Sequence, residues 1–166
     1  MNVQAALKSQ YHASLAMLKQ AVEQCPDDLW AGGNYPIAFW HVAYHTLFFT
    51  HLYLHPSLEA FRPWAQHREE YQFFDEVPWP PHNLPRIGEP YTKQQILEYW
   101  KFLNELVDAA VDRLDLDAPE CGFPWYKMPK LDHQINNIRH LQHHTALLAG
   151  RLRQANGTDV QWVGPC

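Results

Sequence analysis

Apolar side chains recur at helical spacing at the start of the chain. Over residues 2–24 they lie four or seven positions apart, at Val3, Leu7, Tyr11, Leu18 and Val22. That spacing places them on one face of an α-helix. Pro26 follows the last of them and ends the pattern. We therefore predict a first amphipathic helix over residues 2–24, followed by a turn at Gly32-Gly33-Asn34.

A second stretch, residues 36–54, is apolar on nearly every side. Pro36 suits the first position of a helix, where its missing N–H costs nothing. A helix without a polar face belongs in the interior of a helical domain. At about 100° per residue, His41 and His45 fall within the same arc as Phe48. Both histidines are therefore predicted to point inward.

Two more amphipathic helices are predicted in the second half of the chain. Thr92 and Gln95 have the spacing of a capping box and start one of them. Its apolar stripe consists of Ile96, Trp100, Leu103, Val107, Ala110 and Leu114. The other covers residues 131–155, with Gly157 beyond its end. Four long helices without strand alternation predict an all-α protein, a four-helix bundle in one domain over residues 1–166.

The segment Pro56–Pro90, between the second and third predicted helices, is long and hostile to helix formation. It holds seven of the 13 prolines and many aromatic residues. A segment of this length in a compact domain usually has a function or carries local structure. We expect it to include a short helix near Ser57–Phe74, to pack on the bundle through its aromatic side chains, and to roof a site at one end of the bundle.

Composition and charge narrow the class of protein. Apolar residues make up 46% and charged residues 19% of the 166 positions, as in globular proteins. The net charge of −5 gives no basic face, so we expect no nucleic-acid partner. No apolar run is long enough for a membrane span and the N-terminus lacks a signal-peptide pattern, which favours a cytoplasmic location. Cys25, Cys121 and Cys166 form no CxxC pair, and Cys25 and Cys121 are interpreted as packed thiols.

Three histidines within five residues carry the candidate chemistry. His140 and His144 are four residues apart and lie one above the other at the edge of the apolar arc of their helix. His143 points away from that arc, toward water. His133 shares the inward face, but seven residues correspond to about 10.5 Å along a helix, too far for the same metal ion. His140 and His144 alone therefore form an inward pair.

Two interpretations of this pair are open. In the first, His140 and His144 are partly exposed residues that hydrogen-bond to their neighbours. In the second, they bind a divalent metal ion, and the second predicted helix supplies a third ligand, His45 or His41. Three histidines and a water form the open coordination set of catalytic metal sites. The inward pair His41 and His45 favours the metal interpretation, because buried imidazoles need partners.

The remaining histidines have simpler interpretations. His12, His51, His55 and His67 are predicted to make ordinary surface or loop hydrogen bonds, and His82 is a weaker candidate for approaching the site. The paired Glu-x-x-His motifs of diiron bundles and the His-Glu-x-x-His motif of metallopeptidases are both absent.

The layout resembles a known family. One inward histidine on the second helix, followed by His-Leu-Gln-His-His-Thr-Ala-Leu-Leu-Ala-Gly-Arg-Leu from His140 onward, is similar to the DinB/YfiT-like superfamily. Its last helix typically contains His-x-x-His-His-x-Gly-Gln-Leu. Thr145-Ala146-Leu147 departs from that pattern, which leaves the two ligand positions intact and removes the glutamine.

The resemblance implies an up-down-down-up four-helix bundle, often a homodimer, with a divalent metal (Zn or Ni, alternatively Fe or Mn). The implied ligands are His140, His144 and His45, with His41 as the alternative to His45. His41 is otherwise the nearest candidate for a catalytic general base. Relatives include S-transferases and isomerases that use low-molecular-weight thiols, so the expected substrate is a small molecule, a thiol among them. The implied activity is thiol-dependent S-transfer or metal-dependent hydrolysis.

Two alternative functions are non-catalytic. One is a metal-stabilised or metal-free bundle that serves binding, dimerisation or a stress response. The other makes the Pro-rich segment mainly a surface for a partner.

Overall fold

The computed structural model describes residues 2–164 and is all-helical. No strand occurs within that range. The helices are α1 (Val3–Gln24), α2 (Asp27–Trp30), α3 (Phe39–Tyr53), α4 (Lys93–Arg113) and α5 (Lys130–Asn156). The predicted all-α class is confirmed.

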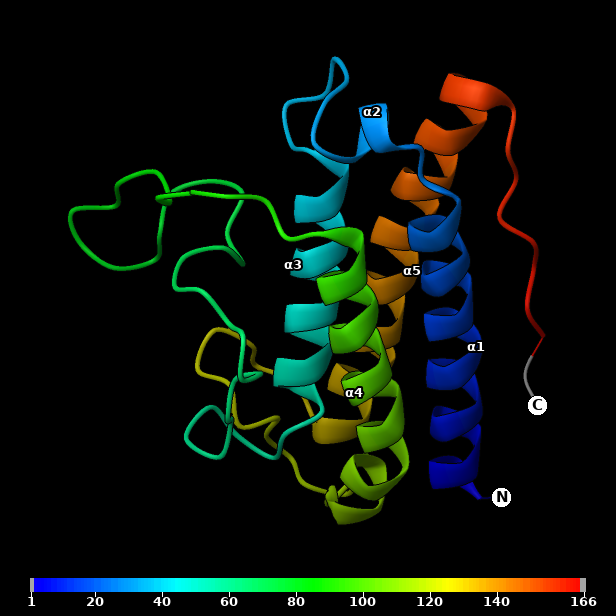
Figure 1. Ribbon diagram of the computed structural model, residues 1–166. Coiled ribbons are helices and arrows are strands. Elements are labelled where there is room, and N and C mark those ends of the chain that lie inside the picture. The colour runs from blue at the N-terminus through cyan, green and yellow to red at the C-terminus, as the bar shows by residue number, and fades with distance from the viewer. Residues whose placement is uncertain (1, 165–166) are drawn as a thin grey trace.

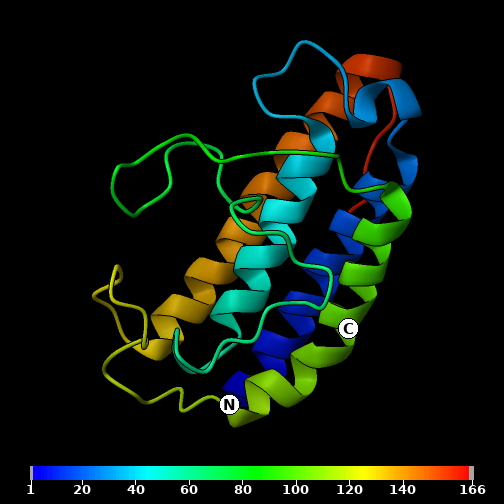
Figure 2. The same ribbon diagram turned by 60° about the vertical axis from the view of Figure 1, so that its left-hand side comes forward.

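The four long helices lie side by side (Figure 1). The chain runs in one direction along α1 and α5 and in the opposite direction along α3 and α4, as Figure 2 shows from a second side. α3 packs chiefly against α5, and α1 packs against both α4 and α5. Residues 54–92, which join α3 to α4, leave the helices and pass along the outer side of α3 (Figure 2). The α3–α5 pair therefore lies next to this long connection.

The helix ends follow local signals that the sequence carries. The Asn2 side chain accepts a hydrogen bond from the Ala5 backbone N at 3.0 Å and caps α1. Thr92 and Gln95 form the predicted capping box of α4. Gly157 ends α5 with a φ of +74°, a left-handed conformation that suits glycine. These boundaries agree with the predictions to within a residue or two.

The start of α3 and the presence of α2 differ from the predictions. α3 begins at Phe39, three residues after Pro36, because Ala38 is extended and the Ile37 carbonyl accepts a hydrogen bond from Arg151 of α5 at 2.8 Å. That distant contact holds the chain out of the helix. The one-turn helix α2 was not predicted, although Asp27 and Asp28 in its first turn are a typical start signal.

The expected short helix near Ser57–Phe74 is wrong. That stretch consists of turns and bends. Pro63 interrupts it, and Glu70 has a φ of +70°, which no right-handed helix accommodates. Trp64 does pack on the helices as expected and stacks on Tyr99 at 4.6 Å between ring centroids, whereas Trp79 is exposed and contacts Phe73 of the same segment.

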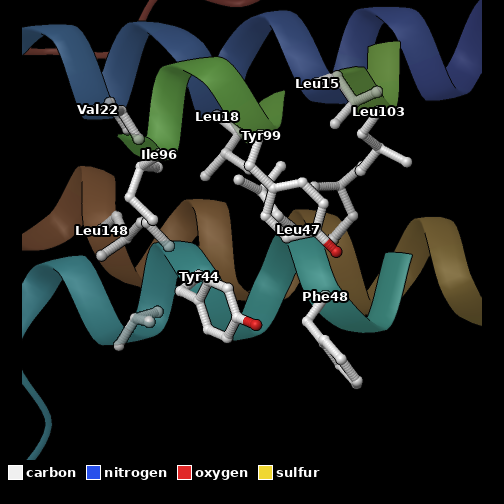
Figure 3. Packing of buried hydrophobic residues seen from close by; sticks show 14 of the residues in the cluster. Leu15, Leu18, Val22, Tyr44, Leu47, Phe48, Ile96, Tyr99, Leu103 and Leu148 are labelled. Carbon is white, nitrogen blue, oxygen red and sulfur yellow. The ribbon is translucent and has the colours of Figure 1, made fainter. Parts of the chain in front are cut away.

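Leucines and tyrosines from all four long helices form the core. Figure 3 shows Leu15 and Leu18 of α1 facing Leu47 of α3 and Leu103 of α4. Tyr99 is fully buried among them and was missing from the predicted stripe, which contained Trp100 instead. Trp100 lies at the edge of the core and donates a hydrogen bond from its indole N–H to the Leu15 carbonyl at 2.7 Å.

A buried polar network links α1, α3 and α5. The Tyr11 hydroxyl donates to Gln134 Oε1 at 2.8 Å and accepts from Asn137 Nδ2 at 2.9 Å. Gln134 and Asn137 also donate to the carbonyls of Tyr53 and Thr50 on α3. Because each of these groups would be costly to bury without its partner, the network fixes the position of α5 along α3.

The helices and the cysteines bear on two expectations from composition. Within residues 2–164, no helix is long and apolar enough to cross a membrane. Cys25 and Cys121 are buried free thiols, as interpreted, and burial raises the pKa of Cys25 to about 12. Cys166 lies outside the described residues.

Candidate metal centre

Three histidines converge between α3 and α5. His45 comes from the middle of α3, and His140 and His144 come from the middle of α5, one turn apart. His140 Nε2 lies 3.2 Å from His45 Nε2 and 3.1 Å from His144 Nε2. Among residues 2–164, these three form the group of histidine, cysteine or acidic side chains that can hold a metal ion.

The separations of His140 Nε2 from the other two Nε2 atoms fit one metal ion. Two ligands bound at about 2.0–2.1 Å lie about 2.8–3.4 Å apart when the angle at the metal is between 90° and the tetrahedral value. The two Nε2 separations, 3.2 and 3.1 Å, are within that range. A tetrahedral or octahedral ion held by three imidazoles keeps at least one position open.

The hydrogen bond on the other side of the His45 ring sets its tautomer. A carbonyl can only accept, so His45 Nδ1–H donates to the Gln72 carbonyl, at 2.6 Å. The neutral ring then has a lone pair on Nε2, directed at the other two histidines. A carbonyl behind a histidine is the usual means by which proteins orient a metal-binding imidazole.

The site favours neutral imidazoles. Burial chiefly, with a smaller contribution from neighbouring histidines, lowers the pKa of His140 to about 4 and that of His144 to about 3. The pKa of His45 is well below its usual range, chiefly through burial, with the Gln72 carbonyl opposing the shift. All three rings are thus unprotonated near pH 7, the form in which histidine binds a metal.

A cation satisfies the three nitrogens better than hydrogen bonds do. If His140 Nε2 carries a hydrogen, that N–H serves only one of its two Nε2 neighbours well. If it carries none, its lone pair faces the lone pair of His45 Nε2 at 3.2 Å. The Nδ1 atoms of His140 and His144 are buried without a hydrogen-bond partner in the described chain, so the tautomers are not fixed from that side. A metal ion would accept all three lone pairs at once.

Aromatic rings from two elements enclose the cluster. Phe74, from the long connection, stacks on His45 at 3.9 Å and lies 5.8 Å from the His144 ring. Phe49 of α3 contacts the rings of His45 and His140 at 4.7 and 5.8 Å. The long connection covers the site as predicted, but the site lies midway along α3 and α5 rather than at an end of the helices.

His41 lies one turn before His45 and is not part of the ligand group. It is buried, stacks on Trp40 at 4.9 Å, and donates from Nε2 to the Tyr71 carbonyl at 2.8 Å. Burial lowers its pKa. Its role as a general base stays a prediction, and in this structure its Nε2–H is engaged by the backbone.

The other histidines fall into two groups. His12 and His55 make the ordinary hydrogen bonds that were expected, and His143 is exposed beside His144. The prediction for His51 was wrong: it is 1% exposed, deep among aromatic rings, and hydrogen-bonded to Tyr99. A single sequence does not show that α3 is covered on its outer side by the connection.

Three further histidines lie outside the ligand group. His67, half-buried, pairs with the Tyr44 hydroxyl at 2.6 Å. His82 is exposed, bonds to the Val77 carbonyl and does not join the cluster. His133 is buried and lies outside the ligand group, as the helical rise predicted.

Gln72 and Phe74 are site residues that sequence reasoning missed. Gln72 contributes only its backbone carbonyl, which any residue supplies, so its identity carried no signal. Phe74 was noted only as one aromatic among many in the segment. Its place over His45 depends on how the whole connection folds back on α3.

Comparison with known proteins finds no family model, no curated protein and no solved structure that matches this chain.

Proposed function

We propose that this protein is a metalloprotein that binds one divalent ion through Nε2 of His45, His140 and His144 and uses the open position for catalysis. The observation that carries the proposal is the convergence of the three Nε2 atoms at 3.1–3.2 Å around His140. Zn or Ni is the proposed ion, with Fe or Mn as alternatives, because imidazole ligands suit all of these metals.

We further propose that the chain is a DinB/YfiT-like protein with an up-down-down-up four-helix bundle. Two observations support this. The chain runs in one direction along α1 and α5 and in the opposite direction along α3 and α4 (Figure 1), and the ligand positions match the motif that carries the resemblance. Homodimer formation and a cytoplasmic location come from the same resemblance and from composition, and are proposed on those grounds alone.

The chemistry follows from the charge of the ligand set. Bound there, a divalent ion would act as a Lewis acid that lowers the pKa of a water or thiol at its open position. Three neutral imidazoles leave its charge uncompensated, and no carboxylate or thiolate belongs to the group. The site therefore favours an anionic fourth ligand, hydroxide or thiolate. Phe49 and Phe74 limit water around the cluster. Thiol-dependent S-transfer and metal-dependent hydrolysis of a small molecule are the two reactions that fit.

Metal analysis of protein purified without an affinity tag tests the metal centre. We expect about one divalent ion per chain, lost when His45, His140 and His144 are all replaced by alanine. His133→Ala is the matched control on α5 and should keep the ion. The proposal fails if the native protein binds no Zn or Ni and the triple variant has the same thermal stability as the native protein in their presence.

Cobalt substitution separates a catalytic site from a structural one. With an open position, a small thiol added to the Co(II) protein should give a sulfur-to-cobalt charge-transfer band. A spectrum unchanged by thiols and by anions such as azide would indicate a closed site. The non-catalytic alternative would then be preferred.

A further inference from the structure

Two histidines one turn apart on α3 hold two consecutive carbonyls of the long connection. His41 Nε2–H donates to the Tyr71 carbonyl at 2.8 Å, and His45 Nδ1–H donates to the Gln72 carbonyl at 2.6 Å. The segment from Glu70 to Tyr91 is called the strap below. The strap is thus held on α3 next to the candidate metal centre. One of the two histidines that hold it, His45, is itself a candidate ligand.

Hydrogen bonds within the strap make its start a well-defined unit. Glu70, in a left-handed conformation, accepts from the backbone N of Arg86 at 2.7 Å and from its Nη2 at 2.9 Å. The Tyr71 hydroxyl accepts from the Gly88 backbone N at 2.8 Å and donates to the Glu89 carbonyl at 3.2 Å. The two carbonyls that face α3 are therefore presented together, and a shift of one would move the other.

The three candidate ligands differ in how they are oriented. His140 and His144 come from the same helix, so their relative placement follows from helical geometry. Neither has a partner on Nδ1. His45 comes from α3, and its ring is held by the Gln72 carbonyl and by stacking on Phe74 at 3.9 Å. The strap supplies both contacts, and so the orientation of His45 depends on the strap.

We propose that docking of the strap on α3 and metal binding are coupled, with His41 as the positioning residue that keeps the strap in the register His45 requires. This inference rests on the proposed metal centre. A metal ion on Nε2 polarises the imidazole and strengthens the Nδ1–H bond to Gln72. Because coupling is reciprocal, a docked strap tightens metal binding by the same factor. Outer partners of metal-binding histidines typically contribute about 10- to 100-fold in affinity.

Zinc affinity of the full chain, measured by competition with a chromophoric chelator, tests the coupling. His41→Phe removes the bond to Tyr71, and we expect the affinity to fall about 10-fold or more. His51→Phe is the matched control: His51 is also buried on α3 and loses one hydrogen bond, but to Tyr99 of α4 rather than to the strap. The zinc affinity of His51→Phe should stay within about 2-fold of the native value. Equal affinities of His41→Phe and the native protein would overturn the proposal.

Two further variants separate positioning from loss of folding. His41→Gln keeps an N–H donor on a side chain of similar reach and should recover part of the affinity. Phe74→Leu weakens the stacking on His45 from the strap side, leaves α3 unchanged, and should also lower the affinity. If His41→Phe does not fold, Phe74→Leu carries the test, and a native zinc affinity in Phe74→Leu overturns the proposal.

Hydrogen exchange gives the reciprocal measurement. Zinc should slow exchange of the amides of residues 70–76 in the native protein and in His51→Phe, but much less in His41→Phe. Equal slowing in all three contradicts the coupling and leaves the metal centre intact. A native protein that binds no zinc overturns the metal centre itself, and the coupling with it, so the two failures are distinguishable.

Discussion

Two histidine environments lie two turns apart on α5 and differ in what the ring nitrogens face. His133 is fully buried in a cage of Tyr53, Phe123 and Tyr126, with ring centroids 4.6–5.2 Å away, and neither of its nitrogens has a hydrogen-bond partner. His140 is less buried, and its Nε2 faces two other imidazole nitrogens. Burial alone therefore does not identify a ligand, whereas convergence of lone pairs does.

The cage and the cluster also differ in what surrounds them. Aromatic rings close on His133 from α3 and from the loop before α5, and Lys130, one turn earlier, donates to the carbonyls of Pro56 and Cys121. A positive charge nearby disfavours a cation at His133. His140 Nε2 instead lies beside the imidazole nitrogens of His45 and His144. We therefore expect the same substitution to have different effects on zinc affinity at His133 and at His140.

Removing one histidine from each environment gives the largest expected difference. His140→Ala deletes a ligand and should weaken zinc binding by more than about 100-fold, beyond the range typical for outer partners. His133→Ala should change the affinity by less than about 2-fold. Isothermal titration of both variants with zinc makes the comparison. Similar losses in both would mean that His133 contributes to the site and that the distinction is wrong.

Acid should destabilise the metal-free protein through both environments. Burial lowers the pKa of His133 and of His140 to about 4, while the unfolded chain takes up protons near pH 6.5. Between these values the unfolded state binds more protons, so the free energy of unfolding falls as the pH drops from about 6.5 toward 4. Each such histidine contributes about 1 kcal/mol per pH unit in that window.

Urea unfolding in the presence of a chelator, at pH values from 4 to 8, measures this fall. His133→Phe should show a shallower fall than the native protein, because one of the protonating groups is gone. A steeper or unchanged slope would show that His133 does not stay neutral in the folded state.

His133→Phe should also raise stability at neutral pH. An unpartnered buried polar group costs about 1–3 kcal/mol, and phenylalanine fits an aromatic cage without such a group. We expect a gain of about 1 kcal/mol, which raises the Tm by about 2–4 °C, and an unchanged zinc affinity. Calorimetry of the metal-free protein gives the Tm. A lower Tm would indicate that the ring nitrogens of His133 have partners in solution, such as a buried water.

The smallest effect is expected at His143. Its side chain is exposed between two candidate ligands in the sequence, and it points away from the cluster. His143→Ala should leave both stability and zinc affinity nearly unchanged, within about 0.5 kcal/mol. Chemical denaturation and the chelator competition assay check this. A marked loss of affinity would make His143 part of the centre.

Predictions from local signals agreed best with the structure. The capping box at Thr92 and Gln95 and the left-handed Gly157 involve residues within one helical turn, so short-range interactions are enough to define them. The spacing of His140 and His144 likewise places both on one face of α5 in any packing. These features could be predicted because their geometry depends on neighbours along the chain.

Predictions that depended on distant contacts agreed less well. α3 starts late because Arg151 of α5 holds the Ile37 carbonyl. His51 is buried because the connection covers the outer side of α3, where Phe61 packs on it at 5.1 Å between centroids. A single sequence contains no local pattern for contacts that span so many residues.

The sequence by itself determined the all-helical class and the inward pair His140 and His144, because both follow from the 3.6-residue period of the α-helix. It left His41 and His45 equivalent, since the two lie one turn apart on the same face. The tertiary structure distinguishes the two: the position of α5 along α3 brings His45 close to His140 and His144, whereas His41 is hydrogen-bonded to the strap. Such choices depend on how separate elements pack, and helical periodicity carries no information about that packing.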